Sequence, residues 1–415
     1  MKNDMIKLMD IYDVVIIGGG ASGMMASIFA AQKGLKTLVL EHNEKLGKKL
    51  YITGKGRCNL TNDSSIENHL NNIVVNNKFM YSALNAFSAQ DVMKFFTDNG
   101  LNIKTERGNR VFPASDKSSD VIKVLENCMR RYGVEVQLNT DVARVIKKDG
   151  YFNIYDKYDN IYTTASVVVA TGGLSYPATG STGYGYKLAR AFGHKIVECK
   201  SALCPILVNE DISELNGLSL KNVVLNVEID SKKFSSQGEM MFTYNSLTGP
   251  ISLTLSSIIN KLNYKNAKIY IDLKPALSYE KLDDKLCREI VTYAKKDYKN
   301  YLHTLLPKKL VDYFYMHSGI ENKKMADINR QDREKIINSL KKFDFSIKSL
   351  DNVRVGIITS GGVDVKEINS KSCESKLVEN LYFIGEVLDV DALTGGYNLQ
   401  IAWSTAYLCA NHLKG

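Results

Sequence analysis

The sequence predicts an α/β protein in which both ends of the chain build one domain and the middle is an insert. An apolar run at residues 13–17, a glycine-rich turn and an amphipathic segment at 21–33 form the start of a βαβ unit. A second strand–helix pair closes the chain at 381–412. Between them, from about residue 195, short strands with hairpin-like spacing give way to a lysine-rich helical stretch.

The elements of the first domain follow in order. A second apolar run at 35–40 completes the βαβ unit. A helix is expected at 88–99, with Ser88 as N-cap and Gly100 at C′, and another at 120–132, preceded by Ser119. Further apolar and alternating runs predict strands at 134–138, 142–147, 151–155 and 166–170, and a helix at 181–192.

The insert has a different pattern. Strands are expected at 206–208, 223–229, 239–244 and 267–273. Helical periodicity then runs through 278–343, with leucines and isoleucines on one face. Strand patterns return at 353–359 and 381–384, and the last helix is expected at 396–412.

Composition excludes several classes of protein. Hydrophobic residues make up 44% and charged residues 24% of 415 positions, which is typical of a globular chain of two or three domains. Seven cysteines without a C-x-x-C pair predict neither a disulfide framework nor a zinc ribbon, which favours a reducing, cytoplasmic location. The charged tail 1–10 offers no signal peptide, and no apolar run is long enough to span a membrane. The six histidines show no metal-ligand spacing.

The glycine-rich turn after the first strand carries the strongest motif. Gly18, Gly20 and Gly23 form G-x-G-x-x-G between a strand and a helix. The first glycine permits the tight turn, the second lets a pyrophosphate approach the backbone, and the third lets helix and strand pack closely. Glu41 follows where an acid is expected to accept from a ribose hydroxyl. These features together predict a dinucleotide site.

Two later segments favour FAD over NAD as the resident cofactor. Residues 167–173 form an apolar strand ending in Thr-Gly, as FAD domains commonly show, and 381–386 form a strand ending in Gly385-Glu386. Glu386 is placed to hold a ribityl hydroxyl. The turn 395–400 opens the last helix, whose amides are expected to face the flavin edge that becomes negative on reduction.

Four long motifs carry a family resemblance: Thr53–Asn62, Arg110–Pro113, Gly172–Gly183 and Gly385–Asp391. The chain resembles the BaiN/YhiN-like FAD-dependent flavoproteins, a bacterial family also known as aminoacetone oxidases, in the two-dinucleotide-binding flavoprotein superfamily. The resemblance covers nearly the whole chain. It implies a Rossmann-like FAD-binding domain (1–195 plus 356–415), an inserted β-barrel-like domain (196–276 plus 344–355) and a small helical domain (277–343).

The sequence departs from the family pattern at three positions. Tyr244 replaces the usual His, Tyr184 stands where Asp is common, and Ala392 stands where Gly is usual. None of these changes touches the FAD glycines. A histidine acid or base at position 244 is therefore not expected.

The motifs and the resemblance together predict a set of residues that contact FAD, and they predict no metal ligands. The expected FAD contacts are Gly18, Gly20, Ala21, Ser22, Gly23, Glu41, Lys49, Thr53, Gly54, Gly56, Arg57, Cys58, Asn59, Leu60, Val142, Ala170, Thr171, Gly172, Gly385, Glu386, Asp391, Gly396, Tyr397, Asn398 and Leu399.

Flavin chemistry leaves the protein to orient the substrate, polarise it and supply a proton. Candidates for these tasks are Tyr176, Tyr244, Tyr397 and Arg57. For Tyr397, simple packing over the cofactor is an equally good interpretation. For Arg57, the alternative interpretation is that it binds the FAD phosphates or caps its loop. For Arg110, an ordinary salt bridge is a better interpretation than polarisation of a substrate carbonyl. Cys58 has no second cysteine nearby and predicts no disulfide-reductase centre.

The leading hypothesis is an FAD-dependent oxidoreductase that reduces an activated C=C bond of a flat apolar oxo substrate, such as an oxo-steroid or oxo-bile acid. NAD(P)H would supply electrons transiently, because no second glycine motif follows a strand. An O₂-using amine or aminoketone oxidase is the alternative, and an RNA-modifying flavoprotein a third hypothesis. A net charge of +9 is mild, and a solvated lysine-rich face explains it more simply than nucleic acid. A monomer or small homo-oligomer is expected.

Overall fold

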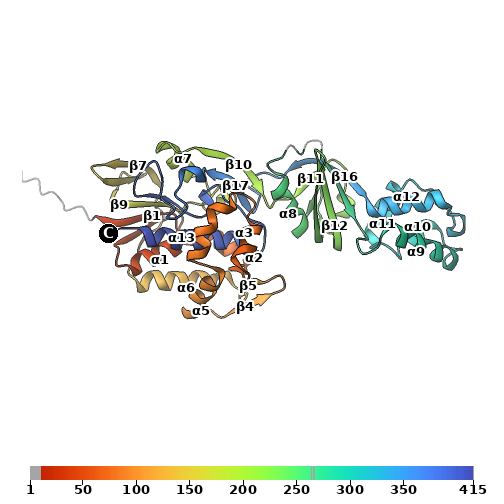
Figure 1. Cartoon of the computed structure of the whole chain (residues 1–415), viewed down its shortest axis with the longest axis horizontal. Coiled ribbons are helices and arrows are strands. Elements are labelled where there is room, and N and C mark those ends of the chain that lie inside the picture. Colours follow the sequence, from red (N-terminus) through yellow and green to blue (C-terminus); the bar gives the residue numbers. More distant parts are fainter. Residues whose placement is uncertain (1–10, 263, 265–266, 415) are drawn as a thin grey trace, which may run out of the picture. The chain divides into compact units, whose positions relative to one another are not determined.

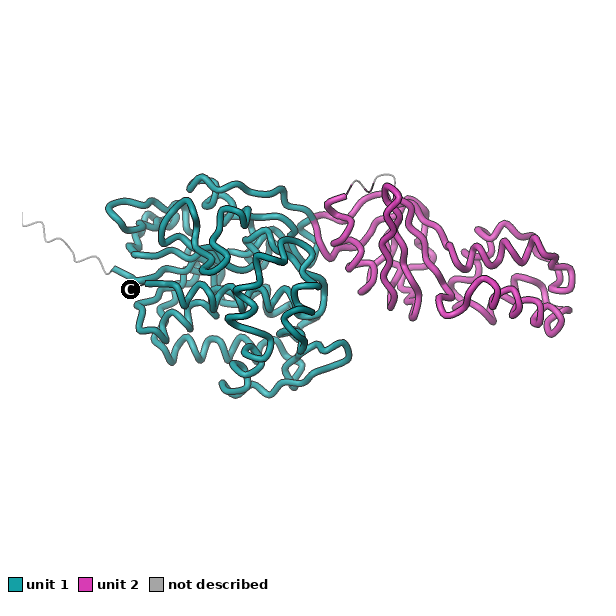
Figure 2. The backbone as a smooth tube through the Cα atoms, viewed as in Figure 1, with its two compact units in different colours: residues 1–200, 353–415 teal, residues 201–352 magenta. Residues whose placement is uncertain are grey.

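The computed structural model describes residues 11–262, 264 and 267–414. It divides into two compact units, Met1–Lys200 with Val353–Gly415, and Ser201–Asn352 (Figure 2). The first unit is a Rossmann-type α/β domain and the second contains a closed β-barrel, which confirms the predicted fold class. The expected helical segment 277–343 lies within the second unit.

A mixed sheet forms the centre of the first unit (Figure 1). Among the described residues it runs in the order β6-β2-β1-β9-β8-β7, with β18 beside β9. Strand β1 pairs in parallel with both β2 and β9, and its residues Val14–Ile16 are fully buried. A parallel strand that is covered on both faces usually consists of consecutive apolar residues, as Val14–Ile17 of β1 do. The strands are β1 (Tyr12–Ile17), β2 (Thr37–Leu40), β6 (Glu135–Gln137), β7 (Val142–Lys148), β8 (Tyr151–Asp156), β9 (Ile161–Val169) and β18 (Leu381–Phe383).

The first and last helices of this unit, which come from opposite ends of the sequence, pack against each other. Helix α1 (Ala21–Gln32) packs against α13 (Tyr397–His412), and both are buried over most of their length. The Lys33 ammonium donates to the carbonyls of Ala410, Asn411 and Leu413, which caps the C-terminal end of α13. The remaining helices of this unit are α2 (Lys48–Gly56), α3 (Ile66–Asn72), α4 (Tyr81–Ala86), α5 (Ala89–Asp98), α6 (Ser118–Arg131) and α7 (Tyr184–Ala191).

Several expected boundaries in this unit were wrong, as two examples show. Helix α6 begins at Ser118 after Lys117, so Ser119 lies inside the helix rather than before it. Residues 353–357 form turns, and the strand expected there is β17 (Ile358–Val363), which pairs with β10 (Ile196–Ala202). Strand β17 contains Gly361, where a Cβ would come within 2.3 Å of a carbonyl oxygen of β10. Glycines needed for close approach weaken the strand pattern in the sequence.

The second unit is built on the barrel. Its order is β11-β14-β13-β12-β15-β16, comprising β11 (Ile206–Val208), β12 (Ser219–Ile229), β13 (Lys232–Phe242), β14 (Ser246–Thr248), β15 (Lys268–Asp272) and β16 (Phe343–Leu350). Helix α8 (Pro250–Ile259) packs on β13. Between β15 and β16 the chain forms α9 (Tyr279–Thr292), α10 (Tyr298–Leu302), α11 (Lys308–His317) and α12 (Arg330–Lys341).

A buried histidine just before β10 contacts the segment after β17 and predicts a pH dependence of stability. The His194 imidazole contacts Glu367 through Nδ1 (3.0 Å) and Ser375 through Nε2 (2.8 Å). Burial lowers its pKa, and the opposing effect of Glu367 does not restore it. The unfolded chain therefore binds more protons below the ordinary histidine pKa of about 6.5.

Stability from this group is complete above about pH 6.5 and is lost as the pH falls towards the lowered pKa of His194. We expect the melting temperature to fall from pH 7.5 to about 5.5, before most carboxylates titrate. His194→Gln should be less stable at neutral pH and should show a flatter profile in thermal melts. An equally steep profile in this variant would contradict the assignment of the pH dependence to His194. It would point instead to His69, whose pKa is also lowered by burial.

Candidate functional site

The three motif glycines at the junction of β1 and α1 have different surroundings. Gly18 has φ +110°, and a Cβ there would lie 2.5 Å from the Ala170 carbonyl oxygen. A Cβ at Gly23 would lie 1.9 Å from the Gly18 carbonyl oxygen. A Cβ at Gly20 would meet no protein atom within 4 Å. The first and third glycines are thus required by packing, whereas the second borders open space.

The start of α1 is suited to an anion. Gly20 is the N-cap, so the N–H groups of Ala21, Ser22 and Gly23 have no partners within the helix, and the helix dipole is positive here. Glu41, only 6% exposed, accepts from the Gly19 N–H at 2.6 Å through one carboxylate oxygen. Its other oxygen accepts from the backbone and side chain of Asn43 at 2.8 and 2.6 Å. A carboxylate can accept about four hydrogen bonds, which leaves room for a ribose hydroxyl.

Segments far apart in the sequence meet at this turn. A Cβ at Gly385, just after β18, would lie 2.6 Å from Ser22 Oγ, and the Gly385 N–H donates to Thr405 of α13. On the other side, Ala170 at the end of β9 borders Gly18. Gly172 has φ +70° and lies against Ser181. Thr171 lies between Ala170 and Gly172, whereas Val142 is buried at the first residue of β7.

A polar cluster lies beside the turn. The Lys49 ammonium is 2.5 Å from both the Glu386 carboxylate and Ser175 Oγ, and Ser175 donates to the other Glu386 oxygen at 2.8 Å. Thr359 of β17 donates its N–H to the same oxygen at 3.0 Å. The Thr359 hydroxyl accepts from the N–H groups of Leu174 and Ser175. Lys49 and Glu386 were expected at the site; Ser175 and Thr359 were not, because only the fold brings β17 to this loop.

The Lys49–Glu386 pair has a predictable energetic role. Its side chains are 21% and 16% exposed, between a surface pair and a fully buried one. We expect Lys49→Met to lower the free energy of unfolding by about 2 kcal/mol, since it leaves a half-buried carboxylate without its cation. The double variant Lys49→Met/Glu386→Gln should recover part of this loss in denaturant melts. Strict additivity of the two single changes would show that the pair is not coupled.

The start of α13 forms a second part of the site. Gly396 is its N-cap with φ +101°, and a Cβ there would lie 2.4 Å from the Thr61 carbonyl oxygen. Thr61 donates to Gln400 at 2.6 Å, and the Trp403 indole donates to the Leu60 carbonyl at 2.9 Å. The Asn59 amide can donate to two carbonyls while accepting from the Gly396 N–H at 3.0 Å. Helix α13 therefore fixes the loop that carries the expected residues 58–60.

Other expected cofactor residues have structural partners. Asn398 accepts from the Ala392 N–H and donates to its carbonyl, so it supports the loop before α13, and Leu399 lies in the first helical turn. Asp391 is fully buried and accepts from Ser360 at 2.7 Å. Helix α2 is interrupted by non-helical backbone at Thr53–Lys55, where Thr53 donates to the Leu50 carbonyl; Gly54 and Gly56 have positive φ.

Arg57 and Cys58 are occupied by other interactions. The Arg57 guanidinium contacts Asp116 and Glu106 at 2.7 and 2.5 Å and lies 4.1 Å from the centre of the Phe112 ring. Both carboxylates raise the pKa of Arg57, so its charge is already neutralised. Burial raises the pKa of the Cys58 thiol to about 12, which makes it a poor nucleophile.

The three candidate tyrosines occupy different environments. Tyr397 is 7% exposed, accepts from the Asn68 amide at 3.1 Å and packs edge-on against His69. Tyr244 belongs to the second unit and is 71% exposed. Tyr176 is 36% exposed, follows Ser175 of the polar cluster and adopts left-handed backbone (φ +53°). Its N–H donates to the Arg354 carbonyl, which holds this conformation.

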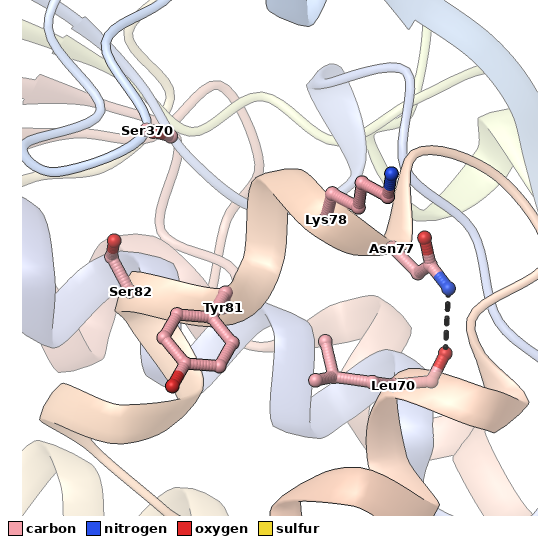
Figure 3. Close-up of a pocket in the computed structure, with 6 residues that line it drawn as sticks. All are labelled: Leu70, Asn77, Lys78, Tyr81, Ser82 and Ser370. Carbon is pink, nitrogen blue, oxygen red and sulfur yellow. Dashed lines mark hydrogen bonds between the residues drawn. The ribbon is translucent and has the colours of Figure 1, made fainter.

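A separate hollow of about 400 Å³ lies beside α3 and α4 (Figure 3). Asn77 donates across it to the Leu70 carbonyl at 3.3 Å. None of its lining residues belongs to the glycine turn or the polar cluster, so it forms no part of the candidate site. The lining residues are Leu70, Asn77, Lys78, Tyr81, Ser82 and Ser370.

Two other kinds of feature are absent from the described residues. No group of three or more His, Cys, Asp or Glu side chains there is arranged to hold a metal ion. No helix in the described ranges is both long and apolar enough to cross a membrane.

The residues present fit FAD. The open space at Gly20, the unpaired amides of α1 and the buried Glu41 suit the adenosine diphosphate half. The polar cluster around Glu386 and the start of α13 are the groups that would contact the flavin half. When bound, FAD supplies hydride transfer at its isoalloxazine ring.

Comparison with known proteins agrees with this assignment. Residues 12–412 match the model of the HI0933-like protein Rossmann domain. The ribosomal RNA dihydrouridine synthase of Haemophilus influenzae is 30% identical over 95% of this chain and 97% of its own. The 3-dehydro-bile acid delta(4,6)-reductase of Clostridium scindens is 30% identical over the same shares. A Rhodococcus jostii 3-ketosteroid-delta4-(5alpha)-dehydrogenase shares the fold, with a TM-score of 0.52 and 14% identity over 99% of each chain.

Proposed function

This chain belongs to the HI0933-like Rossmann-domain family and is an FAD-dependent oxidoreductase, and on that premise we propose that it reduces a C=C bond conjugated to a carbonyl in uridine of RNA. NAD(P)H is the proposed electron donor. Substrate and donor are proposals, whereas the family and the flavin chemistry follow from the full-length match and the dinucleotide site.

The relatives' names describe one kind of reduction on two molecules. Dihydrouridine is uridine with two hydrogens added to the C5=C6 bond, which is conjugated to the C4 carbonyl. The Δ4,6 bonds of a 3-dehydro bile acid are likewise conjugated to the 3-carbonyl. Each reduction requires a hydride at one alkene carbon, a proton at the other and a donor at the carbonyl. This common requirement supports the same reaction type here.

The charge of the helical segment 277–343 is the observation that supports RNA as the substrate. It contains fifteen lysines and arginines against ten aspartates and glutamates, an excess of five out of the chain's nine. A local excess of cations is the electrostatic footprint of proteins that bind phosphate backbones. A flat apolar oxo substrate does not require it. An oxo-steroid remains the second candidate, favoured by the relative from Clostridium scindens.

The protein's own task in this reaction is to hold the substrate and to supply the proton. Of the candidate residues in the first unit, Arg57 is neutralised by two carboxylates, and the Tyr397 hydroxyl is buried against Asn68. Tyr176 is partly exposed and directly follows Ser175 of the polar cluster. Tyr176 is therefore the proposed proton donor.

The test separates the two halves of the reaction. The purified holoenzyme is mixed anaerobically with NADH or NADPH, and bleaching of the flavin absorbance is followed. The reduced enzyme is then mixed with uridine-containing ribosomal RNA fragments or with a panel of oxo-steroids. We expect bleaching by a nicotinamide and reoxidation by the RNA, with dihydrouridine formed in it.

Two outcomes would overturn the proposal. Reoxidation by an oxo-steroid and not by RNA would support the second candidate. Bleaching by an aminoketone or amine, with no bleaching by NAD(P)H, would instead support an oxidase that passes electrons to O₂.

A further inference from the structure

A three-stranded antiparallel sheet in the first unit lies in a part of the sequence that is rich in cations. Its order is β3-β5-β4, with β3 at Thr61–Asn62, β5 at Arg110–Pro113 and β4 at Ile103–Glu106. Residues 53–63 and 103–117, which carry this sheet and its loops, contain six lysines and arginines against three aspartates and glutamates. The charge around the sheet therefore favours an anionic ligand.

Two of the three acids are neutralised within one cluster. Glu106 and Asp116 bond to Arg57 at 2.5 and 2.7 Å. The ammonium of Lys104 lies 2.6 Å from Asp116 and 3.7 Å from Glu106. The cluster holds two cations and two acids, so the charge that this surface presents to a ligand comes from the other side chains.

The remaining cations have no ion pair among the described residues. Arg110 donates to the Arg107 carbonyl at 3.0 Å and lies 5.8 Å from the centre of the Phe112 ring, so the salt bridge expected for it from the sequence is not formed. The exposed cations without an ion pair are Lys55, Arg107, Arg110 and Lys117. Asp63, the third acid, donates its N–H to the Asn109 carbonyl between β4 and β5 and offsets one of these charges. Three positive charges therefore remain in excess.

The turn between β4 and β5 borders the turn that opens α13. The buried Asn62 side chain donates from one nitrogen to the Gly108 carbonyl at 2.9 Å and to the Gly395 carbonyl at 3.1 Å. Gly108 directly follows Arg107, and Gly395 directly precedes the N-cap of α13. Since both carbonyls bond to one nitrogen, the hairpin lies next to the helix start that is expected to face the flavin.

The loop before β3 belongs to the same surface. A Cβ at Gly54 would lie 3.5 Å from the Phe112 ring, and the Arg57 guanidinium lies 4.1 Å from the centre of that ring. Lys55 stands between these two residues in the sequence and is exposed. The charge of Lys55 therefore adds to that of Arg107 and Arg110 around Phe112.

The exposed position of these cations favours a polynucleotide over a small phosphate ligand. Neither the lysine nor the two arginines line the hollow of Figure 3. A dinucleotide such as NAD(P)H is usually held in a glycine-rich turn, and no second G-x-G-x-x-G follows a strand in this sequence. A nucleic acid backbone instead requires exposed cations along a surface, and arginine binds phosphate oxygens in pairs.

We propose that Lys55, Arg107 and Arg110, together the hairpin cations, bind phosphates of the RNA strand that carries the substrate uridine. The inference rests on the proposed function for its choice of polyanion. It extends that function by naming the surface, beside the start of α13, that positions the strand. Backbone contacts of this kind give affinity and register without reading sequence.

The test measures RNA binding separately from chemistry. A labelled single-stranded ribosomal RNA fragment is bound to the full-length holoenzyme by filter retention over a series of salt concentrations. The variant Arg107→Gln/Arg110→Gln is compared with Arg130→Gln/Arg131→Gln, which removes the same two charges from exposed arginines at the end of α6. That end lies about 20 Å along the helix from Lys117, which is beyond the screening length of about 8 Å at physiological salt.

We expect the hairpin variant to bind RNA at least tenfold more weakly at low salt. Its log–log salt slope should be shallower by about 1.4, which corresponds to two lost phosphate contacts with a single strand. The matched variant should stay within about twofold of the wild type, because its charges are screened from the hairpin. Flavin content, melting temperature and the NADPH concentration for half-maximal flavin bleaching should be unchanged in both variants.

Unchanged affinity and salt slope in the hairpin variant would overturn the docking proposal while leaving the proposed reaction intact. A higher NADPH requirement in this variant, with unchanged RNA retention, would assign the hairpin cations to the nicotinamide donor instead. Equal losses of RNA binding in the two double variants would indicate general electrostatic attraction and would also overturn the proposal. Failure of every RNA to reoxidise the flavin, with the salt slope still reduced only in the hairpin variant, would overturn the proposed reaction and not the docking surface.

Discussion

Gly20→Ala is expected to weaken FAD binding strongly while leaving the apoprotein as stable as the wild type. A Cβ at Gly20 meets no protein atom within 4 Å, and its φ of −81° is accessible to alanine. The methyl group would instead occupy the space in which a pyrophosphate approaches the start of α1. We expect FAD affinity to fall by roughly 100-fold or more, about 2.7 kcal/mol. Flavin fluorescence titration of the apoprotein and its melting temperature measure the two effects.

Gly23→Ala is the matched comparison at the same turn. Its Cβ would lie 1.9 Å from the Gly18 carbonyl oxygen, so α1 must move away from β1. We expect this variant to lose about 3 kcal/mol of stability as well as FAD. The contrast between the two glycines distinguishes cofactor contact from packing. Normal FAD affinity in Gly20→Ala would contradict the placement of the pyrophosphate.

The glycine turn shows why part of the site can be predicted from sequence. The positive φ at Gly18, the open position at Gly20 and the close packing at Gly23 are requirements of one βαβ unit, although the backbone that approaches Gly18 most closely is that of Ala170 after β9. Such local requirements leave a fixed spacing in the sequence. The capping box of α5, in which Ser88 and Asp91 bond reciprocally, was predictable as a helix start for the same reason.

Other parts depend on contacts between distant segments. Arg57 lies in a distinctive motif, yet its partners Glu106 and Asp116 come from a neighbouring hairpin and loop. Thr359 reaches Glu386 only because β17 begins after the turns at 353–357. Helix α8 was not predicted, because its serines and β-branched residues suit a strand as well as a helix. Its helical form depends on packing against β13, which the local sequence does not record.

Tyr176→Phe is expected to slow substrate reduction by about 100-fold or more while leaving flavin reduction by NAD(P)H unchanged. A positioned general acid contributes roughly 10²–10⁴-fold to a rate, and phenylalanine removes only the hydroxyl. The ring should keep its place, because the backbone of Tyr176 is held by the Arg354 carbonyl and by Thr179, which donates back to the Tyr176 carbonyl. Anaerobic stopped-flow mixing measures the reductive and oxidative halves separately.

Tyr244→Phe is the matched control, since it removes the same hydroxyl from a residue that is 71% exposed in the second unit. The rate of the oxidative half-reaction of this variant should stay close to that of the wild type. If Tyr176 donates the proton, the remaining rate in Tyr176→Phe should also lose the pH dependence that a tyrosine acid imposes. An oxidative rate within threefold of the wild type in Tyr176→Phe would exclude this residue as the donor. A large loss in Tyr244→Phe would transfer the role to Tyr244.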